Sequence, residues 1–422
     1  MVENDTLKRI LVENAEFAGE TTLTPRPLAI EQKGNYVFTG PRRAGKSFLM
    51  LQLIQNIMKE GGTQKDFLYV RFEDERLIEL DTDGLERLVI AHSELYGAGK
   101  PTVFLDEIQV VPGWEKFVRR LADSKYRVLI TGSNAQVISS EIASQLGGRF
   151  LIQKVFPYSF AEFLAANGCV FGPEARYGRK RIEQARLFET WFSWGGFPEI
   201  VLYRDKRLWL ENLYQKIFYG DIMARYEIRN GAALRLLVKK LAESVGSEMS
   251  VNRMRNIIAS IGISVGKSTI IDYLTYLVES YMVIPAENGL KKLSEREQNK
   301  KYYFVDNGIL SLFIPHESAM LLENMVAIEL SREGHAIRFA KDGAEIDFYV
   351  EETETAIQVC HSLSDSEILQ REIKSLFKIN ETLRAKYLVI ITKDEDRDIC
   401  HNGKTVNVVS IQNWLMNRVH GN

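Results

Sequence analysis

The segment Gly40-Pro-Arg-Arg-Ala-Gly-Lys-Ser47 has the residue types and the spacing of a loop that binds phosphate groups. Its glycines allow consecutive backbone N–H groups to surround phosphate oxygens at the positive start of a helix. Lys46 would neutralise the β and γ phosphates of a nucleotide, and the Ser47 hydroxyl would bind Mg²⁺. The predicted nucleotide-binding residues are Gly40, Pro41, Arg42, Arg43, Ala44, Gly45, Lys46 and Ser47.

The sequence on either side of this segment supports the same interpretation. Residues 36–39 form an apolar stretch typical of a strand, and residues 48–59 carry apolar side chains at the spacing of an amphipathic helix. A phosphate-binding loop needs this strand before it and this helix after it. An ordinary glycine-rich turn, which is the alternative, needs neither. We therefore expect ATP and Mg²⁺ as ligands.

A second candidate element is the apolar run at 101–105, which ends in Asp106 and Glu107. Such a run is typical of a buried parallel strand, and ligands bind at the carboxyl ends of these strands. Asp106 would bind the Mg²⁺ hydration shell opposite Ser47. Glu107 would orient and deprotonate the attacking water. The combination predicts ATP hydrolysis, with Lys46 and Glu107 as catalytic residues.

Residues 67–72 are predicted to form a strand between these two motifs, and residues 126–134 a further strand that ends in small polar side chains. This second strand resembles the sensor strand of AAA+ and related ATPases, in which a polar side chain contacts the γ phosphate or the attacking water. Ser133 and Asn134 are the candidates for that catalytic role. Capping of the following helix is the alternative, because Ser and Asn favour that position.

Arg149 precedes a fifth predicted strand at 150–155. Its guanidinium could stabilise transition-state charge as an arginine finger, in its own subunit or in a neighbouring one. A surface salt bridge is the alternative.

Composition bounds the class of protein. The chain has 422 residues, enough for two to four domains, and its 45% hydrophobic and 26% charged residues are ordinary for a globular protein. It contains no apolar stretch of membrane-spanning length, and its polar N-terminus is unlike a signal peptide, so we expect a cytoplasmic protein with no membrane partner. The three Cys lack metal-ligand spacing. A net charge of -2 argues against a protein that coats nucleic acid.

Charge is uneven along the chain. Residues 225–301 contain 13 Lys and Arg against 8 Asp and Glu, whereas residues 313–422 contain 12 against 18. The basic part has the pattern of a winged helix, with helices at 234–245, 251–260 and 268–281 and two strands around a tip that carries Lys291, Lys292 and Arg296. Such a module binds duplex DNA through its third helix and its wing, or serves as a rigid spacer. Asp272 on the third helix would repel phosphate.

Motifs along most of the chain carry a family resemblance. They are the phosphate loop, Phe-Leu-Asp-Glu-Ile-Gln, Ile-Thr-Gly-Ser-Asn-Ala, Gly-Gly-Phe-Pro-Glu and Tyr-Phe-Val-Asp-Asn-Gly. The chain resembles the AAA+-like ATPases of bacteria and archaea that carry an appended C-terminal domain of unknown function. This resemblance implies a P-loop ATPase core, a winged helix and a C-terminal domain similar to PD-(D/E)XK nucleases.

The implied nuclease site is incomplete in this sequence. Glu323 is in place on a predicted helix and Asp347 on a strand, but Gln358 stands where the pattern has an acid and Cys360 where it has a lysine. Two carboxylates bind Mg²⁺ in such enzymes, and the lysine positions the nucleophile. We therefore expect a degenerate site that binds metal weakly, through Asp347 together with Glu323 or Glu345, and does not cleave nucleic acid. Docking of a protein partner is the expected role.

The fold class that follows is α/β, with an AAA+-like P-loop core of the catalytic-glutamate class, then a helical and winged-helix region, then an α/β nuclease-like domain. The predicted boundaries are 1–165, 166–233, 234–312 and 313–422. The favoured function is an ATP-driven switch or motor. An ATP-dependent sensor or scaffold without turnover and an ATP-dependent nuclease are the alternatives, and the sequence assigns no oligomeric state.

Overall fold

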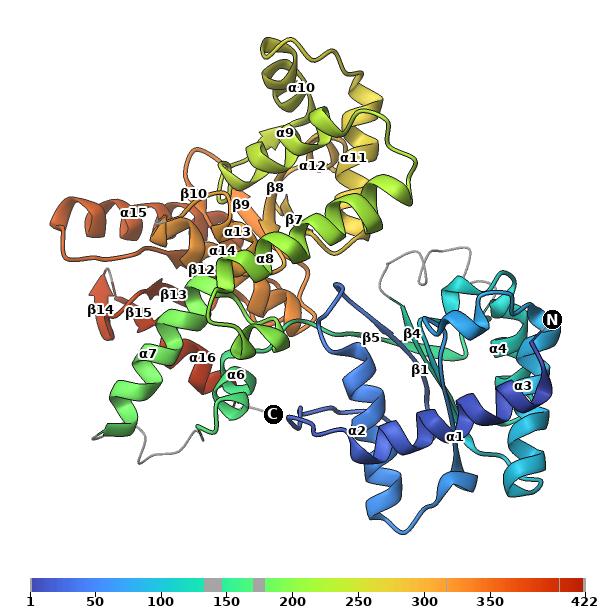
Figure 1. The fold of residues 1–422 in the computed structure, drawn as a ribbon. Coiled ribbons are helices and arrows are strands. Elements are labelled where there is room, and N and C mark those ends of the chain that lie inside the picture. Colours follow the sequence, from blue (N-terminus) through green and yellow to red (C-terminus); the bar gives the residue numbers. More distant parts are fainter. Residues whose placement is uncertain (1, 133–145, 170–178, 316, 402, 420–422) are drawn as a thin grey trace. The chain divides into compact units, whose positions relative to one another are not determined.

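The computed structural model describes residues 2–132, 146–169, 179–315, 317–401 and 403–419 (Figure 1). The chain divides into two compact units, Met1–Phe156 and Pro157–Asn422. The first boundary predicted from the sequence, at 165, therefore lies nine residues late, because the helix α6 (Phe160–Ala166) packs with the second unit.

The first unit is built on a parallel sheet whose described strands lie in the order β2-β3-β4-β1-β5. The strands are β1 (Asn35–Thr39), β2 (Phe67–Arg71), β3 (Thr102–Asp106), β4 (Val128–Gly132) and β5 (Phe150–Lys154). The predicted strands all occur. β1 to β4 are apolar runs buried within the sheet, whereas the edge strand β5 leaves Leu151 and Ile152 exposed. This confirms the P-loop core.

Helices cover both faces of this sheet, as Figure 1 shows for α2 on one side and α3 and α4 on the other. The alternation along β1 explains the arrangement: Val37 packs with α3 and α4, whereas Tyr36 and Phe38 pack with α2. The helices are α1 (Asn4–Glu20), α2 (Lys46–Lys59), α3 (Thr82–Tyr96) and α4 (Trp114–Asp123), with short 3-10 turns η1 (Gln64–Asp66), η2 (Glu75–Leu77) and η3 (Ile108–Val110).

The second unit begins with helical segments that form an aromatic-rich core. The Trp side chains of this region lie in that core, as expected for packing residues; Trp191 and Trp209 are buried. The segments are α6, α7 (Arg179–Trp194), η6 (Pro198–Leu202), α8 (Lys206–Gln215) and the π-helix η7 (Lys216–Ala224).

The elements predicted for the winged helix are present in the expected order. They are α9 (Gly231–Ala242), β6 (Met249–Ser250), α10 (Val251–Ser260), α11 (Lys267–Glu279), β7 (Val283–Asn288), α12 (Leu293–Gln298) and β8 (Asn299–Phe304). The short helix α12 occupies the tip between the two strands, where the sequence predicted only a basic loop.

The predicted boundary at 312 does not separate two folding units. Strands β9 (Arg338–Lys341) and β10 (Glu345–Ile346) come from the C-terminal segment, yet β9 pairs with β7, giving the sheet order β10-β9-β7-β8-β6. Helices α13 (Asn307–Ser311) and α14 (Ser318–Arg332) pack in the same core. Because β7 and β9 are hydrogen-bonded in one sheet, the predicted domains 234–312 and 313–422 form a single folding unit.

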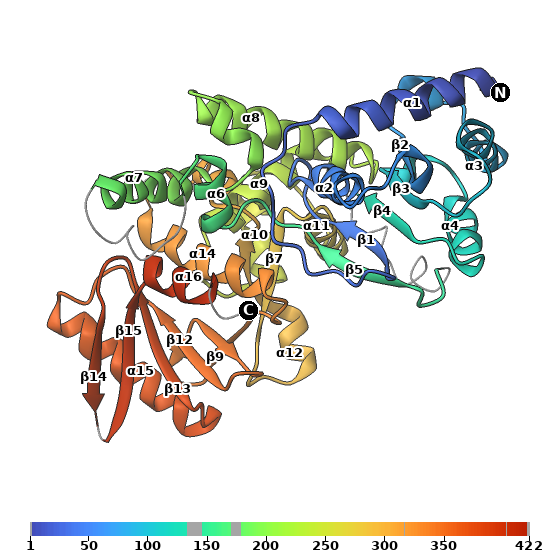
Figure 2. The same ribbon diagram turned by 90° about the horizontal axis from the view of Figure 1, so that it is seen from below.

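A second sheet of this unit has the order β11-β12-β13-β15-β14. Helix α15 packs on one face and α16 on the other, as the ribbon in Figure 2 makes visible. The elements are β11 (Phe348–Val350), β12 (Thr355–Val359), α15 (Ser366–Leu383), β13 (Tyr387–Thr392), β14 (Arg397–His401), β15 (Lys404–Ser410) and α16 (Ile411–Val419).

Candidate functional site

The phosphate loop joins the carboxyl end of β1 to the amino end of α2. Gly45 is the N-cap of α2 with φ 97°, and Gly40 has φ 149°. A Cβ atom at Gly40 would lie 2.1 Å from the carbonyl oxygen of Val155, at the end of β5. Both glycines are therefore required, one by its backbone angles at the helix start and the other mainly by the close approach of β5.

Lys46 lies inside this loop and is almost fully buried. Its ammonium donates to the carbonyl oxygens of Gly40 and Pro41, both at 3.0 Å. The loop thus holds a buried cation at the start of a helix, next to backbone N–H groups. Such a place favours an anionic ligand.

Asp106, at the end of β3, is the polar centre of the site. Its Oδ1 accepts hydrogen bonds from the hydroxyls of Ser47 (3.0 Å) and Thr131 (2.6 Å), and its Oδ2 accepts one from Tyr69 (3.3 Å). Burial raises the pKa of Asp106 to about 6, against the effect of the hydrogen bond from Thr131. The structure brings Ser47 and Asp106 together across 59 residues, as the two motifs predict.

Thr131 of β4 is a site residue that the sequence analysis missed. Besides donating to Asp106, its hydroxyl accepts a hydrogen bond from the backbone N–H of Glu107 at 2.8 Å. Glu107 itself has left-handed backbone angles, φ 57° and ψ 42°, which are strained for a residue with a side chain. Thr131 therefore fixes the backbone turn that aims Glu107.

Glu107 borders a pocket of about 260 Å³ at the ends of β2 and β3. Asp106 lines it too, with the acidic turn 73–75 and Arg71. Gln109 donates a short hydrogen bond to the Glu107 carboxylate. The pocket gives a water molecule room beside a carboxylate, which is what a general base needs.

The oxygen atoms of Ser47 and Asp106 suit Mg²⁺, which prefers hard oxygen ligands and keeps several waters. Among the described residues, Ser47 and Asp106 are the two candidate ligands in contact with each other, so water and phosphate oxygens would complete the shell. In the part of the chain that the structure describes, no group of three or more His, Cys, Asp or Glu side chains is arranged, as it stands, to hold a metal ion by itself.

Arg26 is a second residue that the sequence analysis missed. Its guanidinium donates to the carbonyl oxygens of Ala44 in the phosphate loop and of Phe156 after β5, both at 2.9 Å. Gln52 of α2 pairs with the Arg26 backbone in both directions. Arg26 thus ties the loop, α2 and the end of β5 together; its partners lie 18 to 130 residues away, so no local pattern could reveal it.

Three further catalytic residues were predicted, Ser133, Asn134 and Arg149. Ser133 and Asn134 lie outside the described residues, so the sensor assignment stays a prediction. Arg149 lies at the amino end of β5, and its guanidinium Nε is 2.5 Å from Asp123 Oδ1, as the salt-bridge alternative expects. Since β5 runs parallel to β1, Arg149 is a whole strand, about 16 Å, from the loop edge of the sheet. Arg149 therefore lies away from the place where an arginine finger of its own subunit would act. The same role in a neighbouring subunit stays a prediction.

The predicted nuclease-like residues gather only in part. Glu323 Oε1 and Asp347 Oδ1 each lie 3.6 Å from the ammonium of Lys301, a residue that the sequence analysis did not assign to this site. Gln358 is buried, and its Oε1 has no hydrogen-bond partner among the described residues. The Cys360 thiol donates to the carbonyl oxygen of Ser362 at 3.2 Å, and burial raises its pKa.

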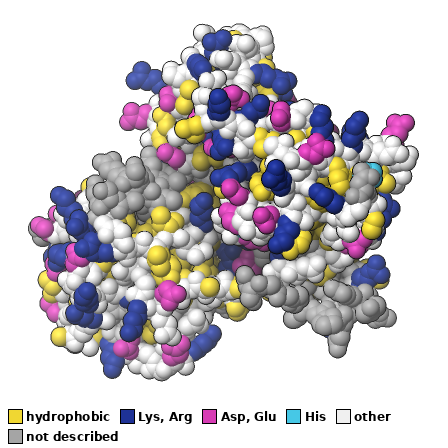
Figure 3. All heavy atoms as spheres, turned by 180° about the vertical axis from the view of Figure 1, so that it is seen from behind, with side chains coloured by type: hydrophobic (Ala, Val, Ile, Leu, Met, Phe, Trp, Pro, Cys, Tyr) yellow, Lys and Arg dark blue, Asp and Glu magenta, His cyan; other side chains and the backbone are white. Residues whose placement is uncertain are grey.

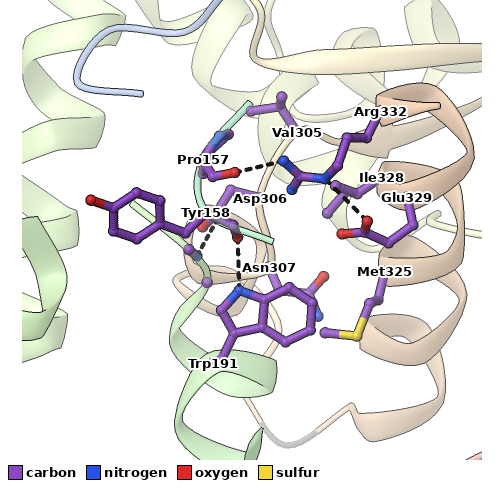
Figure 4. A pocket seen from close by; sticks show the side chains of 12 residues that line it. Pro157, Tyr158, Trp191, Val305, Asp306, Asn307, Met325, Ile328, Glu329 and Arg332 are labelled. Carbon is purple, nitrogen blue, oxygen red and sulfur yellow. Dashed lines mark hydrogen bonds and ion pairs between the residues drawn. The ribbon is translucent and has the colours of Figure 1, made fainter. Parts of the chain in front are cut away.

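The motifs Gly-Gly-Phe-Pro-Glu and Asp-Asn-Gly meet in the second unit around a cavity of about 10 Å³ (Figure 4). The buried carboxylate of Asp306 accepts hydrogen bonds from the backbone N–H groups of Gly196 and Gly308, both at 2.8 Å. A Cβ atom at Gly195 would lie 1.9 Å from Asp306 Oδ1. Figure 4 shows Arg332 beside this group, donating to the Pro157 carbonyl oxygen and to Glu329. The two motifs therefore hold the turn at Gly195 and Gly196 against the start of helix α13.

Comparison with known proteins places the nucleotide motifs in a family. Residues 32–164 match the family described as "AAA domain", and residues 185–318 match a "Domain of unknown function (DUF8612)". The uncharacterized protein MJ1544 of Methanocaldococcus jannaschii is 31% identical over 403 residues, which are 92% of this chain and 89% of that protein.

An uncharacterized protein of Haemophilus influenzae is 29% identical over 403 residues, covering 90% of this chain and 94% of that protein. Among solved structures, the Walker-type ATPase PABY2304 of Pyrococcus abyssi is 14% identical and aligns with 74% of this chain and 96% of its own, with a TM-score of 0.41. None of the helices that the structure describes has the length and apolar character to cross a membrane. The chain belongs to the same family as its M. jannaschii relative, and its residues 32–164 form the AAA domain of an AAA+-like P-loop ATPase.

Proposed function

We propose that the chain binds Mg²⁺-ATP and hydrolyses it, and that the nucleotide state drives a switch or motor. The observation that carries this proposal is the contact between the Ser47 hydroxyl and Asp106 Oδ1, with Glu107 as the next residue. It joins the metal-binding and the water-activating positions at one edge of the sheet.

The residues divide the work as follows. Lys46 and the loop N–H groups bind the β and γ phosphates, Ser47 and Asp106 hold Mg²⁺, and Glu107 accepts a proton from the attacking water. When bound, Mg²⁺ supplies charge neutralisation on the phosphates. Thr131 keeps Asp106 and the Glu107 backbone in place.

Titration with a fluorescent ATP analogue, followed by steady-state phosphate release, tests this proposal. Lys46→Ala should abolish tight binding because the phosphates lose their buried cation. A matched control is Lys59→Ala at the exposed end of the same helix, which should bind like the parent. Equal affinity in Lys46→Ala and the parent would contradict the proposal.

A second part of the proposal is a winged helix that binds duplex DNA. It is favoured by the order of α9, β6, α10, α11, β7 and β8 and by the basic balance of 225–301. On the face of the molecule in Figure 3, Lys and Arg are interspersed with Asp and Glu. A rigid spacer is the alternative, and docking of a protein partner stays the role proposed for the C-terminal part.

A further inference from the structure

Three carboxylates of the second unit converge on the ammonium of Lys301, in β8. This Nζ atom lies 2.9 Å from Glu345 Oε1 in β10. It lies 3.6 Å from Glu323 Oε1 in α14 and 3.6 Å from Asp347 Oδ1, just after β10. The Lys301 side chain is 0% exposed. We call Lys301, Glu323, Glu345 and Asp347 the Lys301 cluster.

Other donors fix the carboxylates in this arrangement. Tyr303, two residues along the same strand, donates its hydroxyl to Glu323 Oε1 at 2.8 Å. The backbone N–H of Val359 in β12 donates to Asp347 Oδ2 at 2.8 Å. Lys341 lies 2.9 Å from Glu345 Oε2. On the other side of Glu323, Gly246 leaves room that a Cβ atom would close, at 2.3 Å from Glu323 Oε2. Each carboxylate is therefore oriented by at least one group besides Lys301.

The ionisation of the cluster agrees with its geometry. Burial by itself would lower the pKa of Lys301, but the three carboxylates raise it above the ordinary value. Burial, and then the nearby charge of Glu323, raise the pKa of Asp347. Lys301 and Lys341 lower the pKa of Glu345 against the effect of burial. At 2.9 to 3.6 Å from three carboxylates that repel one another, the buried ammonium of Lys301 lies where their counter-ion belongs.

The position of this ammonium matters because convergent carboxylates are what a divalent cation binds. A Mg²⁺ or Mn²⁺ ion would need oxygen atoms at about 2.0 to 2.2 Å around the point that Lys301 Nζ now occupies. A second cation a few ångströms from a buried ammonium would be strongly repelled. The ammonium and a metal ion therefore exclude each other.

We propose that Lys301 is the resident cation of a latent divalent-metal site, and that the Lys301 cluster joins the two sheets of the second unit instead of cutting nucleic acid. Lys301 comes from the sheet that contains β8, whereas Asp347 holds β12 of the other sheet through Val359. The Lys301 cluster thus connects the sheet that contains β8 with the sheet that contains β12. Removing the ammonium should uncover a site for Mn²⁺.

The test is Lys301→Met, measured by thermal unfolding of the nucleotide-free full chain with and without millimolar Mn²⁺. Without metal, the three unpaired carboxylates should lower the midpoint by about 10 °C. Mn²⁺ should raise the midpoint of Lys301→Met again by about half of that loss or more, because it binds the folded state only. Mn²⁺ should change the unfolding midpoint of the parent no more than it changes the midpoint of Lys300→Met.

Lys300→Met is the matched control, since Lys300 is the preceding residue of β8 and pairs with Glu287 and Glu297 instead. Adding Asp347→Asn to Lys301→Met should remove the Mn²⁺ effect. Failure of Mn²⁺ to stabilise Lys301→Met, or a Lys301→Met midpoint equal to that of the parent, would overturn the proposal.

A second measurement needs no Lys301 variant and serves if Lys301→Met is not recovered as folded protein. Electron paramagnetic resonance of Mn²⁺ titrated into the nucleotide-free parent and into Asp347→Asn should give the same bound fraction. Mn²⁺ that the parent binds and Asp347→Asn does not would contradict the role of Lys301 as resident cation.

Discussion

At the scale of single residues, the hydroxyl of Thr131 decides the geometry of the ATPase site, because it contacts both Asp106 and the Glu107 backbone. Neither partner is its sequence neighbour. Without this hydroxyl, the Glu107 N–H would lose its hydrogen bond to Thr131, and Asp106 would lose the shortest of the three hydrogen bonds described above.

Thr131→Val should therefore lower the free energy of unfolding by about 1 to 3 kcal/mol, the cost of leaving buried polar groups unpaired. The matched control is Thr39→Val in the adjacent strand β1. The Thr39 hydroxyl is buried, and among the described residues it has no hydrogen-bond partner, so this change should cost little. Urea denaturation of both variants makes the measurement. Equal losses would mean that the Thr131 contacts contribute nothing.

The raised pKa of Asp106 predicts a pH dependence of Mg²⁺-nucleotide binding. Mg²⁺ needs the ionised carboxylate, so below a pKa of about 6 a proton competes and the affinity should fall about tenfold per pH unit. Calorimetric titration with Mg²⁺-ADP between pH 5 and 8 measures this. Asp106→Asn corrects for the titration of the nucleotide itself; the same pH profile in both proteins would refute the assignment.

The raised pKa of Asp106 also makes the free energy of unfolding depend on pH. Without nucleotide, this dependence has the opposite sign to that of nucleotide binding. Since the folded-state pKa lies above the ordinary value of 3.8, the contribution of Asp106 to stability is fully present below pH 3.8. It is lost as the pH rises through about 6. Binding of a cation at neutral pH relieves this cost, which links nucleotide binding to stability.

At the scale of elements, the phosphate loop depends on how closely β5 approaches Gly40. Gly40→Ala should displace the loop, because the new Cβ atom would lie 2.1 Å from a backbone oxygen. We expect a loss of stability of more than about 3 kcal/mol, beyond backbone strain alone, together with weaker nucleotide binding.

Gly61→Ala is the control for Gly40→Ala. Gly61 also has a positive φ, 92°, but a Cβ atom there would meet nothing within 4 Å. It should show backbone strain only and keep the nucleotide affinity of the parent. Thermal unfolding and nucleotide titration compare the two; parental affinity in Gly40→Ala would show that the loop tolerates the displacement.

Elements with a local sequence pattern could be predicted, whereas contacts between distant parts of the sequence could not. The strands of the first sheet and the pairing of Ser47 with Asp106 could be predicted, because each rests on a local pattern with fixed spacing. Thr131 could not be singled out, since only the neighbouring positions of β3 and β4 in the sheet bring it to Asp106. Lys301 and Arg26 were missed for the same reason: their partners are distant in the sequence. The boundary at 312 failed because pairing of β7 with β9 is non-local.

At the scale of the whole molecule, the winged-helix proposal predicts weak DNA binding that depends on salt. Lys291 Nζ lies 3.9 Å from Glu295 Oε2 at the first turn of α12. Lys292 is the N-cap of that helix. Neutralising both lysines should reduce the log-log salt slope by about 1.8, if each contacts one phosphate. Fluorescence anisotropy with a duplex at several salt concentrations measures it.

Lys239→Gln with Lys240→Gln on α9 is the matched double variant, and its slope should equal that of the parent because the proposal places no phosphate there. No duplex affinity at low salt, with or without ATP, would assign the module to the spacer role instead.

We propose that Glu107 activates water for ATP hydrolysis in a site held by Ser47, Asp106 and Thr131. The most direct measurement is phosphate release by the parent and by Glu107→Gln at saturating Mg²⁺-ATP, with nucleotide affinity measured in parallel. We expect Glu107→Gln to bind ATP like the parent and to lose turnover by a factor of about 10² to 10⁴, the size of a general-base contribution. Turnover in Glu107→Gln equal to that of the parent would contradict the account.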